Sequence, residues 1–349
     1  MIGRTGDEFG VLFARNDTGH YFSDVLSSLL RAGAALLTAV AATMTMPVSP
    51  ARADDGGNPL AGRPFYVDPI SNAMRAAKNA NPPSPELTAI ANTPTAYWLD
   101  QAFPASTVAN TVGRYVGAAQ AAGATPVLAL YAIPNRDCGS FAAGGFGSAD
   151  GYRQWIDAVA AGLGSMPAAI ILEPDAIAMA DCLSPAQRDE RFDLLSYAVD
   201  SLTRDPAAAV YIDGGHSRWI SAEELAAGLN RVGVDKARGF SLNTTNYFTT
   251  EEQIGYGEAV SAMTGGAHYV IDTSRNGAGP APDSPLMWCN PSGRAMGAAP
   301  TTDTAGPHAD AYLWVKRPGE SDGACSSGQP AAGQFVASYA IELVRNANG

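Results

Sequence analysis

An apolar run that ends abruptly in two carboxylic acids is the stretch of this sequence best suited to acid–base chemistry. Residues 170–172 (Ile-Ile-Leu) are followed by Glu173, Pro174 and Asp175. Proline lacks a backbone N–H and restrains the residue before it to an extended conformation, so a strand should stop near Glu173. Asp175 would then lie just past the carboxyl end of the strand, where reacting groups collect in parallel α/β proteins. Alternatively, Asp175 is a loop acid that caps the next helical turn.

Polar residues also follow most of the other apolar runs. They are Asp100, Asp137, Asp213, Asn243, Asp272 and Lys316. The carboxyl ends of parallel strands lie at one edge of a sheet, so we expect these side chains to converge on one mouth. Several acids in one mouth, without a cluster of metal-ligating residues, favour general acid–base catalysis by carboxylates that needs no metal and no other cofactor.

Aromatic side chains near the same edge indicate a carbohydrate as the substrate. Trp98, Tyr131, Trp219 and Trp288 all fall at or near the ends of apolar runs. An aromatic ring offers a large flat apolar face, which suits the apolar face of a pyranose ring. Each of these residues could instead pack in the core. Four of them at one edge are better explained as a platform for a sugar chain.

Apolar runs alternate with helix-forming segments along most of the chain. We expect strands at 65–69, 95–100, 126–133, 168–173, 210–213, 240–243, 269–272 and 312–316, and helices at 72–79, 107–122, 150–162, 185–203, 221–231 and 334–346. Near-continuous apolar strands between helices are typical of a parallel sheet covered on both faces. Because the composition does not break, the pattern predicts one α/β domain, with a barrel favoured over an open sheet.

The first 53 residues have the pattern of a secretory signal. Arg31 precedes an apolar run at 32–46, and the small-residue site Ala51-Arg52-Ala53 follows. The run is too short for a comfortable membrane span, although an uncleaved anchor that keeps the protein at the cell envelope is the alternative. We expect residues 1–53 to be removed, 54–63 to be a short polar tether, and 64–349 to be the catalytic domain of a secreted protein.

The charge balance narrows the range of partners. The formal net charge is −12, and the first 53 residues are neutral with four Arg and four Asp or Glu, so the acidic surplus lies downstream. Nucleic-acid binding requires basic patches that neutralise phosphates, and it is therefore not expected. No glycine-rich nucleotide-binding motif is found either. An acidic surface suits a neutral partner such as an uncharged sugar polymer.

The four cysteines point to disulfides. Cys138, Cys182, Cys289 and Cys325 lack the close spacing of zinc ligands, and the four histidines do not cluster with them. Two long-range disulfides in an exported protein are the better explanation. Four cysteines allow three pairings, and their order along the chain favours 138 with 182 and 289 with 325.

Six motifs together make residues 65–348 resemble the glycoside hydrolase family 6 cellulases. They are Tyr131-Ala-Ile-Pro-Asn-Arg-Asp137-Cys138, Glu173-Pro-Asp175, Tyr211-Ile-Asp213-Gly-Gly-His216-Ser-Arg-Trp219, Asn243-Thr-Thr-Asn246-Tyr247, Trp288-Cys289-Asn290 and Trp314-Val-Lys316-Arg-Pro-Gly-Glu320-Ser-Asp322-Gly323. The resemblance implies a distorted, TIM-barrel-like parallel α/β barrel of about seven strands that hydrolyses β-1,4-glucan with inversion at the anomeric carbon.

The resemblance also implies a role for each of four acids. Asp175 matches the general acid that protonates the leaving oxygen, with a pKa raised by burial and by nearby acids. Asp137 resembles an aspartate that keeps this acid protonated and can relay a proton from water. Asp322 matches the aspartate usually proposed as general base, an assignment disputed within the family, and Asp213 resembles an acid that orients the site. Inversion requires room for a water, with carboxyl groups roughly 6.5–9.5 Å apart.

A further set of residues matches positions that contact sugar in the family. These are Trp98, His216, Trp219, Asn246, Trp288, Lys316 and Glu320, and Tyr131 matches a tyrosine that helps to distort the ring at the cleavage point. His216 could instead be a structural histidine. Lys316 and Glu320 could instead be a surface ion pair of little energetic weight.

Three departures from the family pattern bear on where the chain is cut. The loop at 139–145 lacks a serine before its glycine pair, and Ala222 stands where processive relatives often carry a tryptophan. The segment between Cys325 and Phe335 is short, whereas relatives that cut from chain ends have an insertion here that roofs the site. We therefore expect an open cleft and a monomeric endo-β-1,4-glucanase. An exo-acting cellobiohydrolase and a non-catalytic glucan-binding protein are the alternatives, and the joint presence of Asp137, Asp175 and Asp322 argues against the latter.

Overall fold

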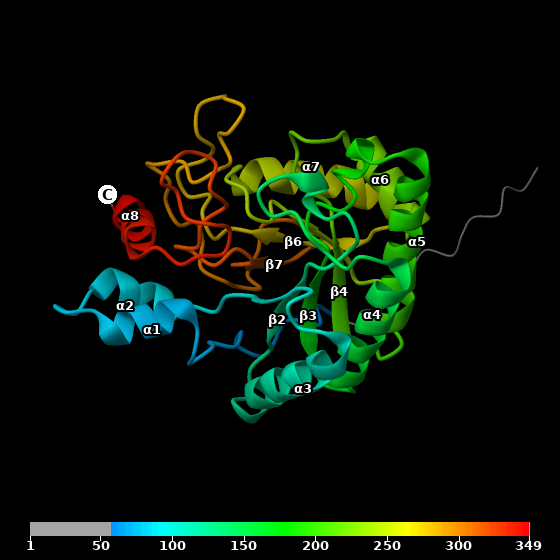
Figure 1. Ribbon diagram of the computed structural model, residues 1–349, viewed down its shortest axis with the longest axis horizontal. Helices are drawn as coiled ribbons and strands as arrows, with labels where there is room; N and C mark the ends of the chain where they lie inside the picture. Colours follow the sequence, from blue (N-terminus) through cyan, green and yellow to red (C-terminus); the bar gives the residue numbers. More distant parts are fainter. Residues whose placement is uncertain (1–56, 349) are drawn as a thin grey trace, which may run out of the picture. The chain divides into compact units, whose positions relative to one another are not determined.

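Seven parallel strands, arranged in the order of the chain, form the sheet at the centre of the protein (Figure 1). The structure is a computed structural model that describes residues 57–348. The strands are β1 (Tyr97–Leu99), β2 (Val127–Leu130), β3 (Ala168–Leu172), β4 (Ala208–Asp213), β5 (Gly239–Leu242), β6 (His268–Asp272) and β7 (Ala309–Leu313). Each strand pairs in parallel with the next. The predicted parallel α/β domain is confirmed.

Helices follow the chain around this sheet. They are α1 (Asn72–Asn79), α2 (Pro85–Ala91), α3 (Ala105–Ala121), α4 (Ala149–Leu163), α5 (Pro185–Leu202), α6 (Ala222–Arg231), α7 (Thr250–Met263) and α8 (Ala337–Ala347), with short 3-10 turns η1 (Asp137–Gly139) and η2 (Ala180–Cys182). Helices α3 to α7 each lie between two consecutive strands, whereas residues 273–308 join β6 to β7 without a helix. Figure 1 shows α3 to α7 beside one another, with α1, α2 and α8 together on the other side of the sheet.

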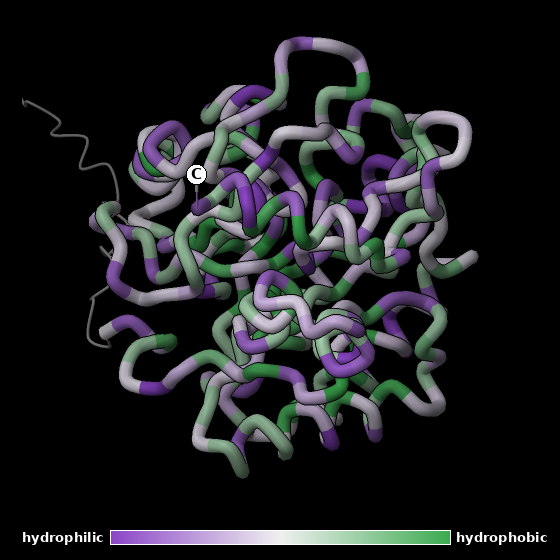
Figure 2. The backbone as a smooth tube through the Cα atoms, turned by 90° about the vertical axis from the view of Figure 1, so that its left-hand side faces the viewer, coloured by the Kyte–Doolittle hydropathy of each residue, from purple (hydrophilic) through white to green (hydrophobic). Residues whose placement is uncertain are grey.

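Alternate residues of each strand enter two different cores, as the period of two in a strand requires. Leu128, Ile170 and Ile212 point toward the helices and join the larger core. Their neighbours Ala129 and Ile171 point into the space enclosed by the curled sheet and form a smaller core. Small side chains such as Ala129 fit this inner space, which other apolar side chains fill. Figure 2 shows hydrophobic stretches of the backbone, in green, running through the middle of the domain.

The two edge strands meet without forming a ladder. In the described part of the chain, the backbone N–H of Ala96 donates to the carbonyl of Trp314 at 3.0 Å, and the Trp98 indole N–H donates to the carbonyl of Val315 at 2.8 Å. These bonds join the start of β1 to the segment that follows β7. The predicted barrel is therefore a strongly distorted one, with an incomplete seam between β1 and β7.

Some predicted elements differ from the structure. The strand expected at 65–69 is only an isolated bridge between Phe65 and Thr125, because prolines at 64 and 69 remove the donors that a ladder needs. Helices α2 and α7 were not predicted, although Ser84 and Thr249 cap their first turns. The last helix begins at Ala337 rather than 334, because Phe335 pairs with Glu320 in an extended bridge.

The expected leader and tether are only partly covered. The predicted signal at 1–53 lies outside the described residues, as do the first three residues of the predicted tether. The rest of that segment contacts the domain: Leu60 is buried in the inner core, and the Asn58 side chain donates to the carbonyl of Asp310. No helix between residues 57 and 348 has the length and apolarity needed to cross a bilayer.

Buried carboxylates at strand ends tie the loops above the sheet to one another. Asp272, at the end of β6, accepts backbone N–H bonds from Thr245 at 3.0 Å, Ser274 at 2.9 Å, Val315 at 3.3 Å and Lys316 at 2.8 Å. These four donors belong to three connections. One carboxylate therefore fixes the loops after β5, β6 and β7.

Glu173 plays the same part at the end of β3. It accepts the N–H groups of Ala132 and Ile133 beyond β2, and burial raises its pKa to about 7. Asn243 at the end of β5 donates to the carbonyls of Phe248 and Asp272. We expected these polar side chains to reach the mouth of the sheet, but they are buried below it, because neighbouring backbone groups satisfy them.

Replacing Asp272 with alanine should destabilise the fold strongly. The change leaves four backbone N–H groups without their acceptor in a buried region, so we expect a loss of about 3 kcal/mol or more in the free energy of unfolding, measured by urea denaturation. The exposed Asp303 provides the control, and Asp303→Ala should change it by less than about 0.5 kcal/mol. Equal effects of the two changes would refute this role of Asp272.

Candidate active site

A cleft of about 1290 Å³ lies across the carboxyl ends of the strands and contains nearly all the predicted site residues. Its lining includes Trp98, Tyr131, Asp137, Asp175, His216, Trp219, Asn246, Trp288, Lys316, Glu320 and Asp322. Asp213 is fully buried and lies beneath Asp175. The structure thus brings together residues that are more than 200 positions apart, while their individual roles stay predictions.

Asp175 and Asp213 form a coupled pair of acids. The backbone N–H of Asp175 donates to Oδ1 of Asp213 at 2.9 Å, and this oxygen also accepts the N–H of Gly215 at 3.0 Å. The Ser241 hydroxyl donates to Oδ2 at 2.8 Å. Burial raises the pKa of Asp213, but these donors stabilise its charged form. Asp213 is therefore the member of the pair that carries the negative charge.

Asp175 holds the proton. Burial, followed by the charges of Asp213 and Asp137, raises the pKa of Asp175 well above its ordinary value. The cations Arg191 and Lys316 act in the opposite direction but do not outweigh these effects. Two interacting carboxyl groups lose their protons in separate steps. Asp175, in the wall of the cleft, therefore keeps its proton to higher pH than an ordinary aspartate does.

Asp137 supplies a second negative charge near this acid. It lies in η1, and its Oδ2 accepts the backbone N–H of Ala142 at 2.6 Å. Partial burial raises the pKa of Asp137, while the Ala142 N–H and the Arg136 guanidinium lower it. Its pKa therefore stays closer to the ordinary range than that of Asp175. Between the two pKa values Asp137 is ionised and Asp175 is protonated.

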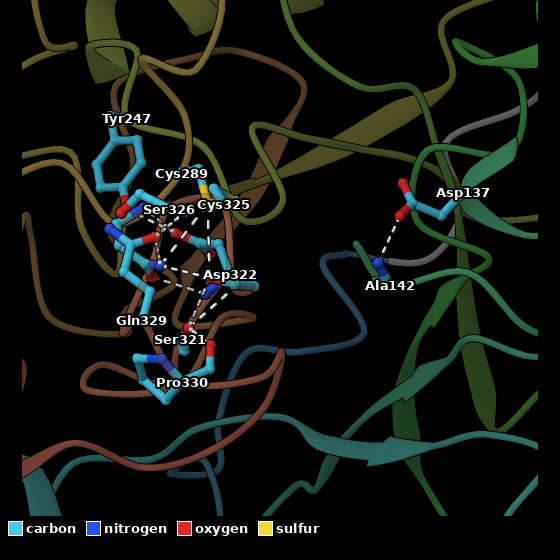
Figure 3. Close-up of a disulfide and its surroundings, with 12 residues drawn as sticks. Asp137, Ala142, Tyr247, Cys289, Ser321, Asp322, Cys325, Ser326, Gln329 and Pro330 are labelled. Carbon is cyan, nitrogen blue, oxygen red and sulfur yellow. Dashed lines mark hydrogen bonds between the residues drawn. A yellow bond between two sulfur atoms is a disulfide. The ribbon is translucent and has the colours of Figure 1, made fainter. Parts of the chain in front are cut away.

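Asp322 is in a different electrostatic environment. It lies 2.9 Å from Nη1 of Arg275 and 3.0 Å from Nζ of Lys316, and it accepts bonds from the Tyr247 hydroxyl and the Asn290 N–H. Burial alone would raise the pKa of Asp322, but the Arg275 and Lys316 cations hold this pKa well below its usual range. Figure 3 shows Asp322 near Tyr247 and the disulfide of Cys289 and Cys325, with Asp137 on a separate loop.

Two disulfides fasten the loops that carry these acids. Cys138, which follows Asp137 directly, is bonded to Cys182, and Cys289 is bonded to Cys325 near Asp322 (Figure 3). The pairing favoured by the order of the cysteines is confirmed. The described residues contain no group of His, Cys, Asp or Glu able to hold a metal ion.

The loops around the site have an unusual backbone. Most non-glycine residues with positive φ lie just after β2, β3 and β5, namely Asn135, Asp137, Cys138, Glu173, Asp175, Asn243 and Thr245, and Asn290 lies in the connection from β6 to β7. A β-branched residue such as Thr245, with φ of 63°, adopts this conformation at a cost. Such conformations persist only where the surroundings hold them. The buried carboxylates and disulfides provide that restraint.

His216 is a neutral residue of the cleft wall. Burial lowers its pKa to about 4, and its Nδ1 accepts the backbone N–H of Arg218 at 3.2 Å. The remaining ring nitrogen, Nε2, therefore carries the hydrogen and can donate. The ring lies 4.2 Å from Phe248 and 5.3 Å from Trp219 between centroids. Both explanations offered for His216 fit the structure, because Nδ1 holds the backbone of Arg218 while Nε2 is left to donate to a sugar hydroxyl.

Lys316 and Glu320 do not form the ion pair that was considered as an alternative. Lys316 pairs with Asp322. Glu320 pairs with Arg317 at 2.8 Å and accepts the side-chain amide of Asn72 at 3.0 Å. Both side chains are nearly buried and line the cleft.

Sequence reasoning missed several cations and one aromatic residue. Arg275 comes three positions after the strand-end Asp272, but nothing in its local sequence shows that it meets Asp322. Arg136 was only part of a motif, and its guanidinium lies 4.2 Å from the Tyr131 ring centroid and 3.0 Å from the Gln101 side chain. Phe141 is 42% exposed and lines the cleft.

Phe141 connects the Asp137 loop with the Asp322 loop. Its ring lies 5.8 Å from that of Trp288, and a Cβ placed on Gly323 would come within 2.6 Å of the Phe141 Cβ. Gly323 also has φ of 153°. Only glycine fits both requirements at this position. The two loops therefore approach each other closely at Phe141 and Gly323.

Comparisons with known proteins agree with this geometry. Residues 57–347 match the profile described as Glycosyl hydrolases family 6. The chain is 47% identical over 285 residues to Endoglucanase A of Cellulomonas fimi, covering 81% of this chain and 61% of that protein. It is 42% identical over 338 residues to Endoglucanase A of Thermobispora bispora, covering 94% and 69%. The chain thus spans less than two thirds of the Cellulomonas protein.

A solved structure is similar throughout the domain. The endoglucanase Cel6 from Mycobacterium tuberculosis, in complex with methyl-cellobiosyl-4-deoxy-4-thio-β-D-cellobioside, is 73% identical and superimposes with a TM-score of 0.83. The match covers 84% of this chain and 100% of that chain.

The charge of Asp137 should be visible in the pH dependence of the hydrolysis of a cello-oligosaccharide. Removing this negative charge with Asp137→Asn lowers the pKa of Asp175, so the acid loses its proton at lower pH. We expect the alkaline limb of the kcat/KM profile to move to lower pH by about one unit or more. The control is Asp100→Asn, because Asp100 lines the same cleft but is not among the charges that dominate the pKa of Asp175. An unmoved alkaline limb in Asp137→Asn would contradict the assignment.

Proposed function

The chain belongs to glycosyl hydrolases family 6 and is a glycoside hydrolase, and we propose that it is a secreted, inverting endo-β-1,4-glucanase acting on cellulose or a related β-glucan. The observation that carries this proposal is the position of Asp175, whose pKa is raised well above its ordinary value, in the wall of a cleft that also presents Trp98, Trp219 and Trp288. A protonated carboxyl group can donate to a glycosidic oxygen, and the aromatic rings suit the faces of glucose units.

In the proposed reaction, Asp175 gives its proton to the leaving oxygen as the bond from the anomeric carbon to that oxygen breaks. A water molecule attacks the same carbon from the opposite face, which inverts its configuration. The proton that this water loses passes to Asp137 through a further water. The net result is hydrolysis, with Asp175 ionised and Asp137 protonated until solvent resets both.

Asp322 is better suited to fix charge and geometry than to accept this proton. A base works best when its pKa lies near the working pH, whereas Arg275 and Lys316 hold the pKa of Asp322 well below its usual range. We propose that Asp322 stays ionised through the reaction. Its negative charge then stabilises the positive charge that develops on the sugar ring, and an oxygen of Asp322 can orient the attacking water.

Two observations bear on where the glucan is cut. The segment from Cys325 to Phe335 is short, which favours an open cleft that admits an internal stretch of chain. The approach of Phe141 to Gly323 and Trp288 brings two loops beside the cleft together, and this is the specific feature that favours the exo-acting cellobiohydrolase as the second candidate. We propose endo action, because the contact depends on one side chain rather than on an inserted loop.

Secretion is supported by the chemistry of the cysteines. The two disulfides fit an oxidising compartment, and residues 1–53 carry a signal-like pattern. We also propose that the protein works as a monomer, since the catalytic acids and the aromatic residues of the cleft all come from one chain.

The decisive test combines viscosity with stereochemistry. We expect the viscosity of carboxymethyl cellulose to fall steeply while few reducing ends appear, and proton NMR of cello-oligosaccharide hydrolysis to show the α-anomer first. Slow viscosity loss with cellobiose as the early product would establish the exo-acting alternative. An initial β-anomer would refute inversion.

Removing the Asp175 carboxyl group should slow hydrolysis most for substrates whose leaving group needs a proton. We expect Asp175→Ala to lower kcat on cello-oligosaccharides about 10²–10⁴-fold, because a sugar leaving group needs a proton. A dinitrophenyl cellooligosaccharide has a leaving group that needs none, so its cleavage should fall far less. Equal losses on both substrates would show that Asp175 is not the general acid. Asp303→Ala again serves as the control for handling and folding.

A further inference from the structure

Helices α1, α2 and α8 form a small cluster beside the seam between β1 and β7. Leu87 and Ile90 of α2 pack against Ala340 and Val344 of α8, and α1 lies against α2 (Figure 1). Helix α1 buries none of its own residues. Its residues Ala73, Ala76 and Ala77 nevertheless pack against this cluster, while Asn72 and Arg75 line the cleft.

The cleft continues from the catalytic acids onto the start of α1. Lys316 lies beside Asp322, and the indole N–H of Trp98 donates to the carbonyl of the preceding residue, Val315. Farther from Asp322, the Glu320 carboxylate accepts a hydrogen bond from the side-chain amide of Asn72 at 3.0 Å. Arg75 donates to Oδ1 of Asn72 at 2.8 Å. The cleft lining includes Asp68, Ile70, Asn72 and Arg75.

Ile70 is conspicuously placed at this end. It is 69% exposed, whereas the other exposed large apolar side chains are 37–43% exposed. A single exposed aliphatic residue needs no explanation by itself. Ile70, however, lines the cleft, and the Asp68 carboxylate holds its backbone N–H at 2.9 Å. The result is an apolar face held beside the carboxylate of Asp68, in the same cleft wall as Arg75.

We propose that Ile70, Asn72 and Arg75 form a further glucosyl-binding subsite, one position beyond Trp98, that takes a unit of a long β-1,4-glucan chain. This inference rests on the proposed function. The chemistry fits a neutral sugar: Ile70 offers an apolar face for the C–H groups of the ring, and Arg75 and Asn72 offer a donor and an amide for its hydroxyl groups.

The subsite has a second consequence for the residues nearer the centre. Asn72 binds Glu320, which is itself paired with Arg317. A glucose unit bound at Ile70, Asn72 and Arg75 therefore contacts the same hydrogen-bonded residues that position Glu320 in the cleft. A long substrate gains contacts at α1 that a short one cannot reach, so the preference for chain length is set outside the catalytic centre.

The test measures kcat/KM against the length of the substrate. Cellotriose, cellotetraose, cellopentaose and cellohexaose are compared for the intact protein and for Ile70→Ala, Arg75→Ala and the double variant. We expect the double variant to lose about 3- to 10-fold on the longest substrate, roughly the value of one lost hydrogen bond, with little change on the shortest. The cleavage position, read with reducing-end ¹⁸O labelling, should shift away from products that occupy this end.

Lys78→Ala provides the matched control. Lys78 is an exposed cation of the same helix and is not part of the cleft lining, so all four substrates should be unaffected. Ile70 and Arg75 are exposed, and unfolding curves of their variants should overlay that of the intact protein. Equal losses at every length, or no loss on cellohexaose, would overturn the subsite. Failure of the unaltered protein to cleave any cello-oligosaccharide would instead refute the proposed function.

Discussion

The hydrogen bonds between buried strand-end carboxylates and the backbone amides of neighbouring loops are the constraint on which the rest of the structure depends. Glu173, Asp213 and Asp272 each hold amides from adjacent connections. A buried charge is tolerated only when it is paired or hydrogen-bonded. The backbone conformation of these loops is consequently fixed by hydrogen bonds to side chains at the ends of the strands. Asp213 serves a second purpose, because its charge also keeps the proton on Asp175.

The site obtains different behaviour from the same chemical group by changing its surroundings. Burial and two negative charges raise the pKa of Asp175 well above its ordinary value, whereas Arg275 and Lys316 hold the pKa of Asp322 well below its usual range. The neighbourhood rather than the residue type assigns each role. The strained backbone at Thr245 and the disulfide next to Asp137 are consistent with this account, since pKa differences of this kind require side chains that do not move.

The sequence was informative where the pattern is local and repeated. Near-continuous apolar runs alternating with helices predicted the parallel sheet, and acids after strands predicted that Asp137 and Asp175 would share one cleft. The sequence was less informative about how deeply each strand-end side chain is buried. Glu173, Asn243 and Asp272 follow strands as Asp175 does, but they bind backbone groups below the cleft. Contacts between distant segments, such as Arg275 with Asp322 or Phe141 with Gly323, leave no local signal. Proline explains the bridge that replaced the strand expected at 65–69.

The central claim is that Asp175 keeps its proton at neutral pH while Asp322 does not. Carbon-13 NMR of protein labelled at the aspartate carboxyl groups tests it directly, with Asp175→Asn and Asp322→Asn used to assign the two signals. The account predicts that the Asp175 carboxyl titrates far above the ordinary range for aspartate and that the Asp322 carboxyl stays ionised to the acid limit of the fold. Titration of the Asp175 carboxyl near pH 4, or of both carboxyls together, would contradict it.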